Sequence, residues 1–168
     1  MLLAVGLRGS VRAVVTKSDT AVALGSGDVP VLGTPRLLAL AEAATVAAVM
    51  PQLGPGETTV GTSVTLEHCR ASPVGAGLVV EAELTKVDGR RLVFSFIARR
   101  EDVPLEPPGE EPSGAVPPAD QPAKGRPARG RPAGGRDQAL APDEHVVGAG
   151  TIERVVVTTE RFLARAGN

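Results

Sequence analysis

A carboxylate, an imidazole and a hydroxyl in the first half of the sequence could together hydrolyse an activated acyl group. Glu42 is the only ionisable residue between Arg36 and Met50, in a stretch made mostly of Ala, Leu and Val. Because burial disfavours a charged carboxylate, Glu42 either holds its proton more tightly than usual or has a partner. His68 ends a strand-like run on its apolar face, and Thr34 lies two helical turns before Glu42. Such a set can supply the nucleophile or base, the proton shuttle and the orienting group of acyl transfer to water.

Each of the three residues also has a purely structural interpretation. A lone glutamate in a helix is usually solvent-exposed, and a lone histidine on an inner strand face is usually a hydrogen-bonded core residue. Thr34 precedes Pro35, which predicts that the threonine hydroxyl caps the start of a helix. The residues alone therefore leave a catalytic site and a set of structural roles as alternatives.

The element that positions Thr34 and Glu42 is predicted to be one long helix. Thr34-Pro35 is a strong helix start, and Pro51 ends the helix at about Met50. Both faces of this helix are apolar, which is typical of a helix that is buried on all sides. One face holds Leu37, Leu38, Ala41, Ala44, Thr45, Ala48 and Val49, and the other holds Ala39, Ala43, Val46 and Ala47.

Strand-like segments lie on both sides of this helix in the sequence. Asp88-Gly89 is a typical two-residue hairpin turn between two of them. One segment precedes the helix, at about Val11–Thr16, and four follow it, at about Glu57–Cys69, Gly77–Val87, Arg91–Arg100 and His145–Thr158. Alternation in the first of these four places Val60, Val64, Leu66 and His68 on one face, opposite Thr59, Ser63, Thr65 and Glu67. We expect an α+β fold in which the four strands form an antiparallel meander in chain order, followed by a short helix at about Thr159–Ala166.

The composition of the 168 residues argues against several kinds of site. Cys69 is the only cysteine, which excludes an intramolecular disulfide framework and a cysteine-based zinc site. His68 and His145 are the only histidines, which leaves little for a histidine-bound metal. The absence of Trp and Tyr and the net charge of −1 argue against an aromatic-cage binder and a polyanion binder. No apolar run is long enough for a membrane span and the first residues make a poor secretory signal, so we expect a cytoplasmic location and no membrane.

Residues 102–143 differ in composition from the rest of the chain. Most of the prolines lie here, and apolar residues larger than Ala are few. Such a segment cannot bury enough surface to offset its chain entropy, so we predict a disordered insertion in a strand–strand loop. The folded domain would then comprise residues 1–101 and 144–168. Arg129–Pro132 resembles the core of an AT-hook, but the local excess of Arg, Gly and Pro favours a low-complexity tract over nucleic-acid attachment through Arg126–Arg136.

Five segments, taken in order, resemble the hotdog-fold acyl-CoA thioesterases related to the fluoroacetyl-CoA thioesterase. The resemblance covers nearly the whole chain except the insertion. The five motifs taken together are fairly specific to the family, whereas no single motif is decisive. The segments are residues 31–44 (VLGTPRLLALAEAA), 60–64 (VGTSV), 68–75 (HCRASPVG), 87–91 (VDGRR) and 148–155 (GAGTIERV).

This resemblance implies a fold, a site and an assembly. The fold is an antiparallel sheet wrapped around one long central helix. Glu42 would be the nucleophile or general base, His68 would act as acid or base, and Thr34 would position water or Glu42. The backbone of Gly61 would lie near the thioester carbonyl. The resemblance also implies a homodimer that binds acyl-CoA near the subunit interface, with no metal or redox cofactor.

One departure from the family concerns the acyl group. The fluoroacetyl-specific enzyme has an aromatic lid near its site, whereas the matching stretch here, Gly25–Val29, has no aromatic residue. We therefore expect hydrolysis of a small acyl-CoA without fluorine selectivity. A non-catalytic hotdog that binds an acyl thioester or a partner is the alternative, and a hydratase is less favoured because no Asp-rich motif with a neighbouring His is present.

Overall fold

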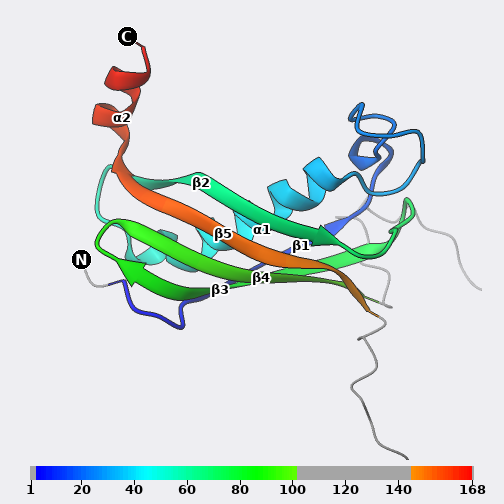
Figure 1. Ribbon diagram of the computed structural model, residues 1–168, viewed down its shortest axis with the longest axis horizontal. Coiled ribbons are helices and arrows are strands. Elements are labelled where there is room, and N and C mark those ends of the chain that lie inside the picture. The colour runs from blue at the N-terminus through cyan, green and yellow to red at the C-terminus, as the bar shows by residue number, and fades with distance from the viewer. Residues whose placement is uncertain (1–2, 102–144, 168) are drawn as a thin grey trace, which may run out of the picture.

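The computed structural model describes residues 3–101 and 145–167, which form a five-stranded antiparallel sheet with one long helix against it (Figure 1). The fold is α+β with the hotdog arrangement, which confirms the predicted class. Helix α1 begins at Thr34 and ends at Val49, and the turn around Pro51 stops it as predicted. The remaining elements are β1 (Arg8–Val14), β2 (Glu57–His68), β3 (Gly77–Asp88), β4 (Arg91–Glu101), β5 (Val146–Thr158) and α2 (Thr159–Ala166).

The order of the strands in the sheet is β1-β3-β4-β5-β2, so the predicted meander in chain order is wrong for β2. Strands β3, β4 and β5 do follow one another as neighbours. Strand β2 instead pairs with β5, with Thr59 opposite Val156, and this places β2 at one edge of the sheet. Alternation shows which face of a strand is buried but not which strand lies beside it, because that choice depends on the whole sheet.

Strand β2 also contains a bulge that changes which side chains face the helix. The register against β5 shifts between Gly61 and Ser63, which leaves Thr62 as the extra residue. Thr59 is buried before the bulge, and Leu66 packs on the core after it. The prediction that Val60 shares a face with Leu66 is therefore wrong, since the extra residue reverses the alternation.

The core forms where α1 crosses the inner faces of the strands. Gly9 of β1 allows the closest approach, because a Cβ atom there would overlap the Ala44 carbonyl oxygen and the Ala48 amide nitrogen. One buried cluster gathers around the first half of α1 and a second around its end, with Phe94 fully buried in the second. The fully buried large side chains include Leu37, Val49, Leu78, Val80, Leu84, Leu92, Phe94 and Ile152.

We predict that Gly9→Ala destabilises the domain by at least about 2 kcal/mol, since the methyl group would force the helix backbone away from β1. Urea unfolding measures the loss. Gly27→Ala is the matched control, because a Cβ at Gly27 makes only ordinary contact at 3.5 Å from Ala21. The control is expected to change the free energy of unfolding by less than about 0.5 kcal/mol. Equal stability of the two variants would contradict close helix–strand packing.

Helix α1 is buried on one side only within this chain. Ala39, Ala43 and Ala47 are exposed, although they belong to the face that was predicted to be buried. The prediction of a helix covered all round is therefore wrong for the single chain. This row of exposed alanines is a surface of small side chains that another molecule can approach closely.

Strands β4 and β5 are neighbours, so residues 102–144 connect two adjacent strands. The predicted disordered insertion at 102–143 and the AT-hook-like stretch Arg129–Pro132 lie outside the described residues. Among the described residues, no helix has the length and apolar character needed to cross a membrane.

Candidate active site

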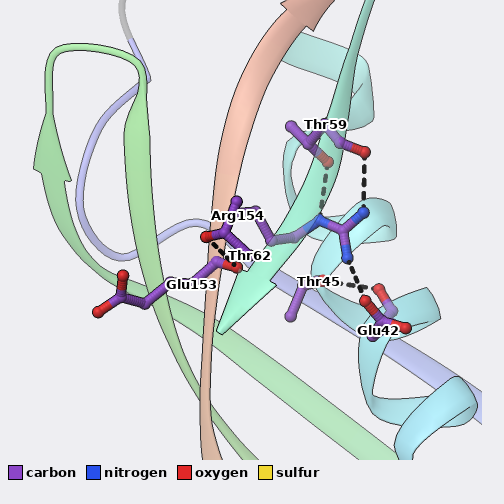
Figure 2. A network of polar contacts seen from close by, with 6 residues as sticks. All are labelled: Glu42, Thr45, Thr59, Thr62, Glu153 and Arg154. Atoms are coloured by element: carbon purple, nitrogen blue, oxygen red, sulfur yellow. Dashed lines mark hydrogen bonds and ion pairs between the residues drawn. The ribbon is translucent and has the colours of Figure 1, made fainter. Parts of the chain in front are cut away.

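Glu42 lies on the side of α1 that faces β2 and β5, and a buried arginine holds its carboxylate (Figure 2). Arg154 reaches from β5, and its Nη1 donates to Glu42 Oε1 at 3.2 Å. The Arg154 side chain is 7% exposed, whereas that of Glu42 is 39% exposed. The carboxylate thus has the partner that the sequence required, and it still faces solvent on one side.

Two further hydrogen bonds fix the guanidinium of Arg154. Its Nε donates to Thr59 Oγ1 at 2.9 Å, and its Nη2 donates to the Thr59 carbonyl oxygen at 2.8 Å. Burial lowers the pKa of Arg154 from its usual value, and the attraction of Glu42 opposes that effect. Arg154 is therefore a rigid cation that sets the position of Glu42.

Gly61 provides the space that the carboxylate occupies. A Cβ atom at Gly61 would lie 2.5 Å from Glu42 Oε1 and 3.8 Å from Arg154 Nη1. Gly61 also precedes the extra residue Thr62 of the bulge, so the strand leaves its regular ladder beside Glu42. The glycine is required here by close approach to a carboxylate and not by a positive φ.

We predict that Gly61→Ala lowers the rate of any reaction that uses the Glu42 carboxylate by about 10-fold or more, because the methyl group displaces the carboxylate from Arg154. Folding should be nearly unaffected, since the displaced atom is the end of a flexible side chain. The steady-state rate and the urea midpoint are measured together. Gly54→Ala, whose Cβ would meet the Glu57 carboxylate at 3.0 Å, is the matched control. A wild-type rate in Gly61→Ala would show that the carboxylate position is not critical.

Thr34 and His68 form a second polar pair, at the start of α1. Thr34 Oγ1 and His68 Nδ1 share a hydrogen bond of 3.0 Å. Gly33 is the N-cap residue of α1, and Thr34 is the first helical residue. The prediction that the Thr34 hydroxyl caps the helix is therefore wrong. The threonine hydroxyl instead orients the imidazole ring.

The other ring nitrogen of His68 is not satisfied within the described residues. His68 Nε2 is buried and makes no hydrogen bond there. Burial lowers the pKa of His68, and the backbone at Arg70 partly offsets this effect. A hollow of about 340 Å³ lies beside the pair, and its lining includes Thr34, His68, Cys69 and Val29. A neutral imidazole with one nitrogen held and the other available can exchange a proton with a bound molecule.

We predict that His68 makes the protein less stable in acid. Its folded-state pKa lies below the unfolded value of about 6.5, so the unfolded chain takes up the proton first as the pH falls. This contribution is complete above the unfolded pKa and is lost as the pH falls through the folded pKa. Urea unfolding at a series of pH values should show a shallower acid loss in His68→Gln than in the wild type. His145→Gln removes the other histidine as the control, and an equal flattening in both variants would contradict the assignment.

The structure brings the predicted site residues together as two pairs. Glu42 is held by Arg154 beside Gly61, and Thr34 is held to His68. Thr34 and Glu42 are eight positions apart on α1, which corresponds to about 12 Å along the helix axis. Among residues 3–101 and 145–167, no three His, Cys, Asp or Glu side chains gather as metal ligands.

Arg154 is the residue that sequence reasoning missed. It lies in one of the segments of resemblance, but its role was not identified. The signal was its position between Ile152 and Val156 on the inward face of β5, where a charged side chain needs a partner. Glu42 was the partner available on the facing helix.

Known proteins resemble this chain in sequence and in fold. A family model described as fluoroacetyl-CoA-specific thioesterase matches residues 15–104. A fluoroacetyl-CoA thioesterase from Streptantibioticus cattleyicolor is 44% identical over 62 residues. These residues are 37% of this chain and 45% of that relative, so the match spans less than half of the relative's length. A solved structure of a fluoroacetyl-CoA thioesterase, 26% identical, superposes with a TM-score of 0.68 over 99% of this chain and 96% of that one. A thioesterase superfamily member from Thermus thermophilus, 19% identical, shares the fold with a TM-score of 0.65 over 96% of this chain and 88% of its own.

Proposed function

Because the chain belongs to the fluoroacetyl-CoA-specific thioesterase family, we propose that it hydrolyses a small acyl-CoA to the free acid and CoA. The observation that supports this function best is the Glu42 carboxylate. It is anchored by a buried arginine, occupies the space left by the missing side chain of Gly61, and keeps one side open to solvent. A carboxylate that is fixed in position and still reachable is suited to attack on a thioester carbonyl or to activation of water.

Two routes use the same groups. In the first, Glu42 adds to the carbonyl carbon, the C–S bond breaks, CoA leaves as a thiolate, and water then hydrolyses the mixed anhydride. In the second, Glu42 removes a proton from water, the water oxygen adds to the carbonyl carbon, and the C–S bond breaks afterwards. Both routes end with one carboxylic acid and one thiol.

The Thr34–His68 pair supplies proton transfer in either route. The Thr34 hydroxyl holds one ring nitrogen, and the other, Nε2, has no hydrogen-bond partner among the described residues, so it is the nitrogen left for proton transfer. In its protonated form this nitrogen gives a proton to the departing sulfur, and in its neutral form it takes one from water. Thr34 therefore acts through His68 and not through Glu42.

We further propose that two copies pair through β2. The edge of β2 away from β5 is unpaired among the described residues, and a free edge of twelve residues is a template for another strand. Glu42 lies beside β2, because a side chain at Gly61 would meet its carboxylate. A two-fold axis across β2 would join the two sheets edge to edge. Sedimentation should give a dimer at micromolar concentration, and a monomer would contradict this assembly.

The acyl group is proposed to be small and not selected for fluorine. The loop beside the hollow, Gly25–Val29, contains no aromatic side chain that could close over a fluoromethyl group. A pocket without a specific contact separates near-isosteres by less than about 100-fold. The ratio of kcat/KM for fluoroacetyl-CoA over acetyl-CoA should stay below that value. A ratio far above it would show that fluorine is selected by other residues.

A further inference from the structure

The C-terminal helix α2 carries an apolar face that its own chain leaves uncovered. Thr159, Phe162, Leu163 and Ala166 share one side at helical spacing, whereas Glu160, Arg161 and Arg165 lie elsewhere on the helix. No residue of α2 is buried; Phe162 is 41% and Leu163 is 62% exposed. Figure 1 shows α2 projecting from the end of β5, away from the rest of the domain. Because an isolated helix of eight residues is marginal in water, this one needs a surface to pack on.

A second uncovered apolar surface lies around the hollow beside Thr34 and His68. Val22, Leu24 and Val29 in the loop before α1 are 52%, 43% and 57% exposed. Val29 lines the hollow itself. A side chain at Gly33 would contact Leu24, which places this leucine close to the start of α1. We call Val22, Leu24 and Val29 the loop patch.

The two surfaces lie at opposite ends of β2. Helix α2 follows directly from Thr158, which pairs with Glu57 at the start of β2, and the Thr159 amide donates to the Gly56 carbonyl. The loop patch and the hollow lie at the other end, where β2 finishes at His68. In an antiparallel pairing of two β2 edges, the start of one strand lies against the end of the other. The dimer proposed above therefore brings α2 of each subunit to the hollow of its partner.

We propose that α2 crosses the subunit boundary and packs on the partner's loop patch, where Phe162 and Leu163 close the hollow beside Thr34 and His68. This inference depends on the proposed dimer but not on the proposed reaction. Closure of the hollow by apolar side chains excludes water from the Thr34–His68 pair except where the substrate enters.

The single cysteine provides a direct test, because Cys69 is exposed and lines the hollow. The Leu163→Cys variant is prepared with and without ¹⁵N label, and the two preparations are unfolded and refolded together to form mixed dimers. A short bis-maleimide then links thiols, and mass spectrometry identifies the joined peptides. We expect links between position 163 of one isotope and Cys69 of the other. Val5→Cys, at a residue that is 61% exposed before β1, is the matched control and should give few such links.

Three results would overturn the proposal. A sedimenting dimer in which Leu163→Cys forms no more mixed links than Val5→Cys would place α2 elsewhere. Links confined to one isotope would show that α2 covers its own chain, and a monomer would remove the partner. Mixed links in a protein that releases no thiol would support the crossing while contradicting the proposed reaction, so the two proposals fail separately.

A kinetic measurement separates site closure from simple docking. Phe162→Ser should raise KM for acyl-CoA by about 10-fold while the dimer persists, and Phe162→Leu should restore most of the loss because it refills the apolar contact. Arg161→Ala, at an exposed position on α2, should leave KM unchanged. An unchanged KM in Phe162→Ser would contradict a role for this side chain at the site.

Discussion

Glu42→Gln is expected to slow thiol release by about 100-fold or more, which is the scale for losing a catalytic base or nucleophile. The glutamine keeps the size of the side chain and an oxygen for Arg154, but its neutral amide neither attacks a thioester nor takes a proton from water. Folding should survive with a small loss of stability, because the buried Arg154 cation keeps both bonds to Thr59 and loses only the charge of its third partner. Thiol release and urea unfolding are measured on the same preparation.

The matched control for this variant is Glu67→Gln. Glu67 is an exposed glutamate on the same strand as Gly61 and has no described contact with Arg154. The control should retain the wild-type rate. A folded Glu42→Gln protein that releases thiol as fast as the wild type would rule out Glu42 as the reacting group.

Replacement of Arg154 is expected to have the second largest effect, on stability as well as rate. Arg154→Met leaves the Thr59 carbonyl and hydroxyl without their partner in a buried position, which costs about 1–3 kcal/mol. Glu42 loses its anchor at the same time, so thiol release should fall by about 10-fold or more. Arg154→Lys should recover part of the stability but little of the rate, since one ammonium cannot hold Thr59 and Glu42 together.

Arg91→Met provides the comparison for a surface arginine. Arg91 pairs with Glu153 at 3.3 Å, but its side chain is 60% exposed, so the change should cost less than about 1 kcal/mol. Urea unfolding and thiol release are measured for the wild type and for Arg154→Met, Arg154→Lys and Arg91→Met, so that the loss of stability is separated from the loss of rate. Thiol release at the wild-type rate in Arg154→Lys would show that the positive charge alone is required. Equal losses of stability and rate in Arg154→Met and Arg91→Met would contradict the role of Arg154 as the anchor of Glu42.

The parts of the fold that depend on local chemistry could be predicted from the sequence. Thr34-Pro35 and Pro51 mark the two ends of α1. The turn between β3 and β4 lies one residue later than predicted, at Gly89 and Arg90, because Asp88 still pairs with Arg91; Gly89 has a φ of 55°. These features depend on residues that are close together in the chain. The predicted bounds of the strands hold to within one residue for β2 to β5.

Features that depend on distant residues could not be predicted in the same way. The pairing of β2 with β5 and the extra residue Thr62 depend on how the whole sheet closes around α1. For the same reason the sequence identified Glu42 as a carboxylate in need of a partner, but not Arg154 as that partner. Thr34 and His68 were both identified, and only the structure shows that the hydroxyl binds the imidazole.

Thiol release by the wild type on a panel of short-chain acyl-CoAs, with Glu42→Gln as the parallel reaction, tests the proposed hydrolysis directly. We expect turnover of at least one small acyl-CoA, and a rate lower by about 100-fold or more in the variant. A folded wild-type dimer that releases no thiol from any member of the panel would contradict the proposed hydrolysis and favour a hotdog that binds an acyl thioester without hydrolysing it.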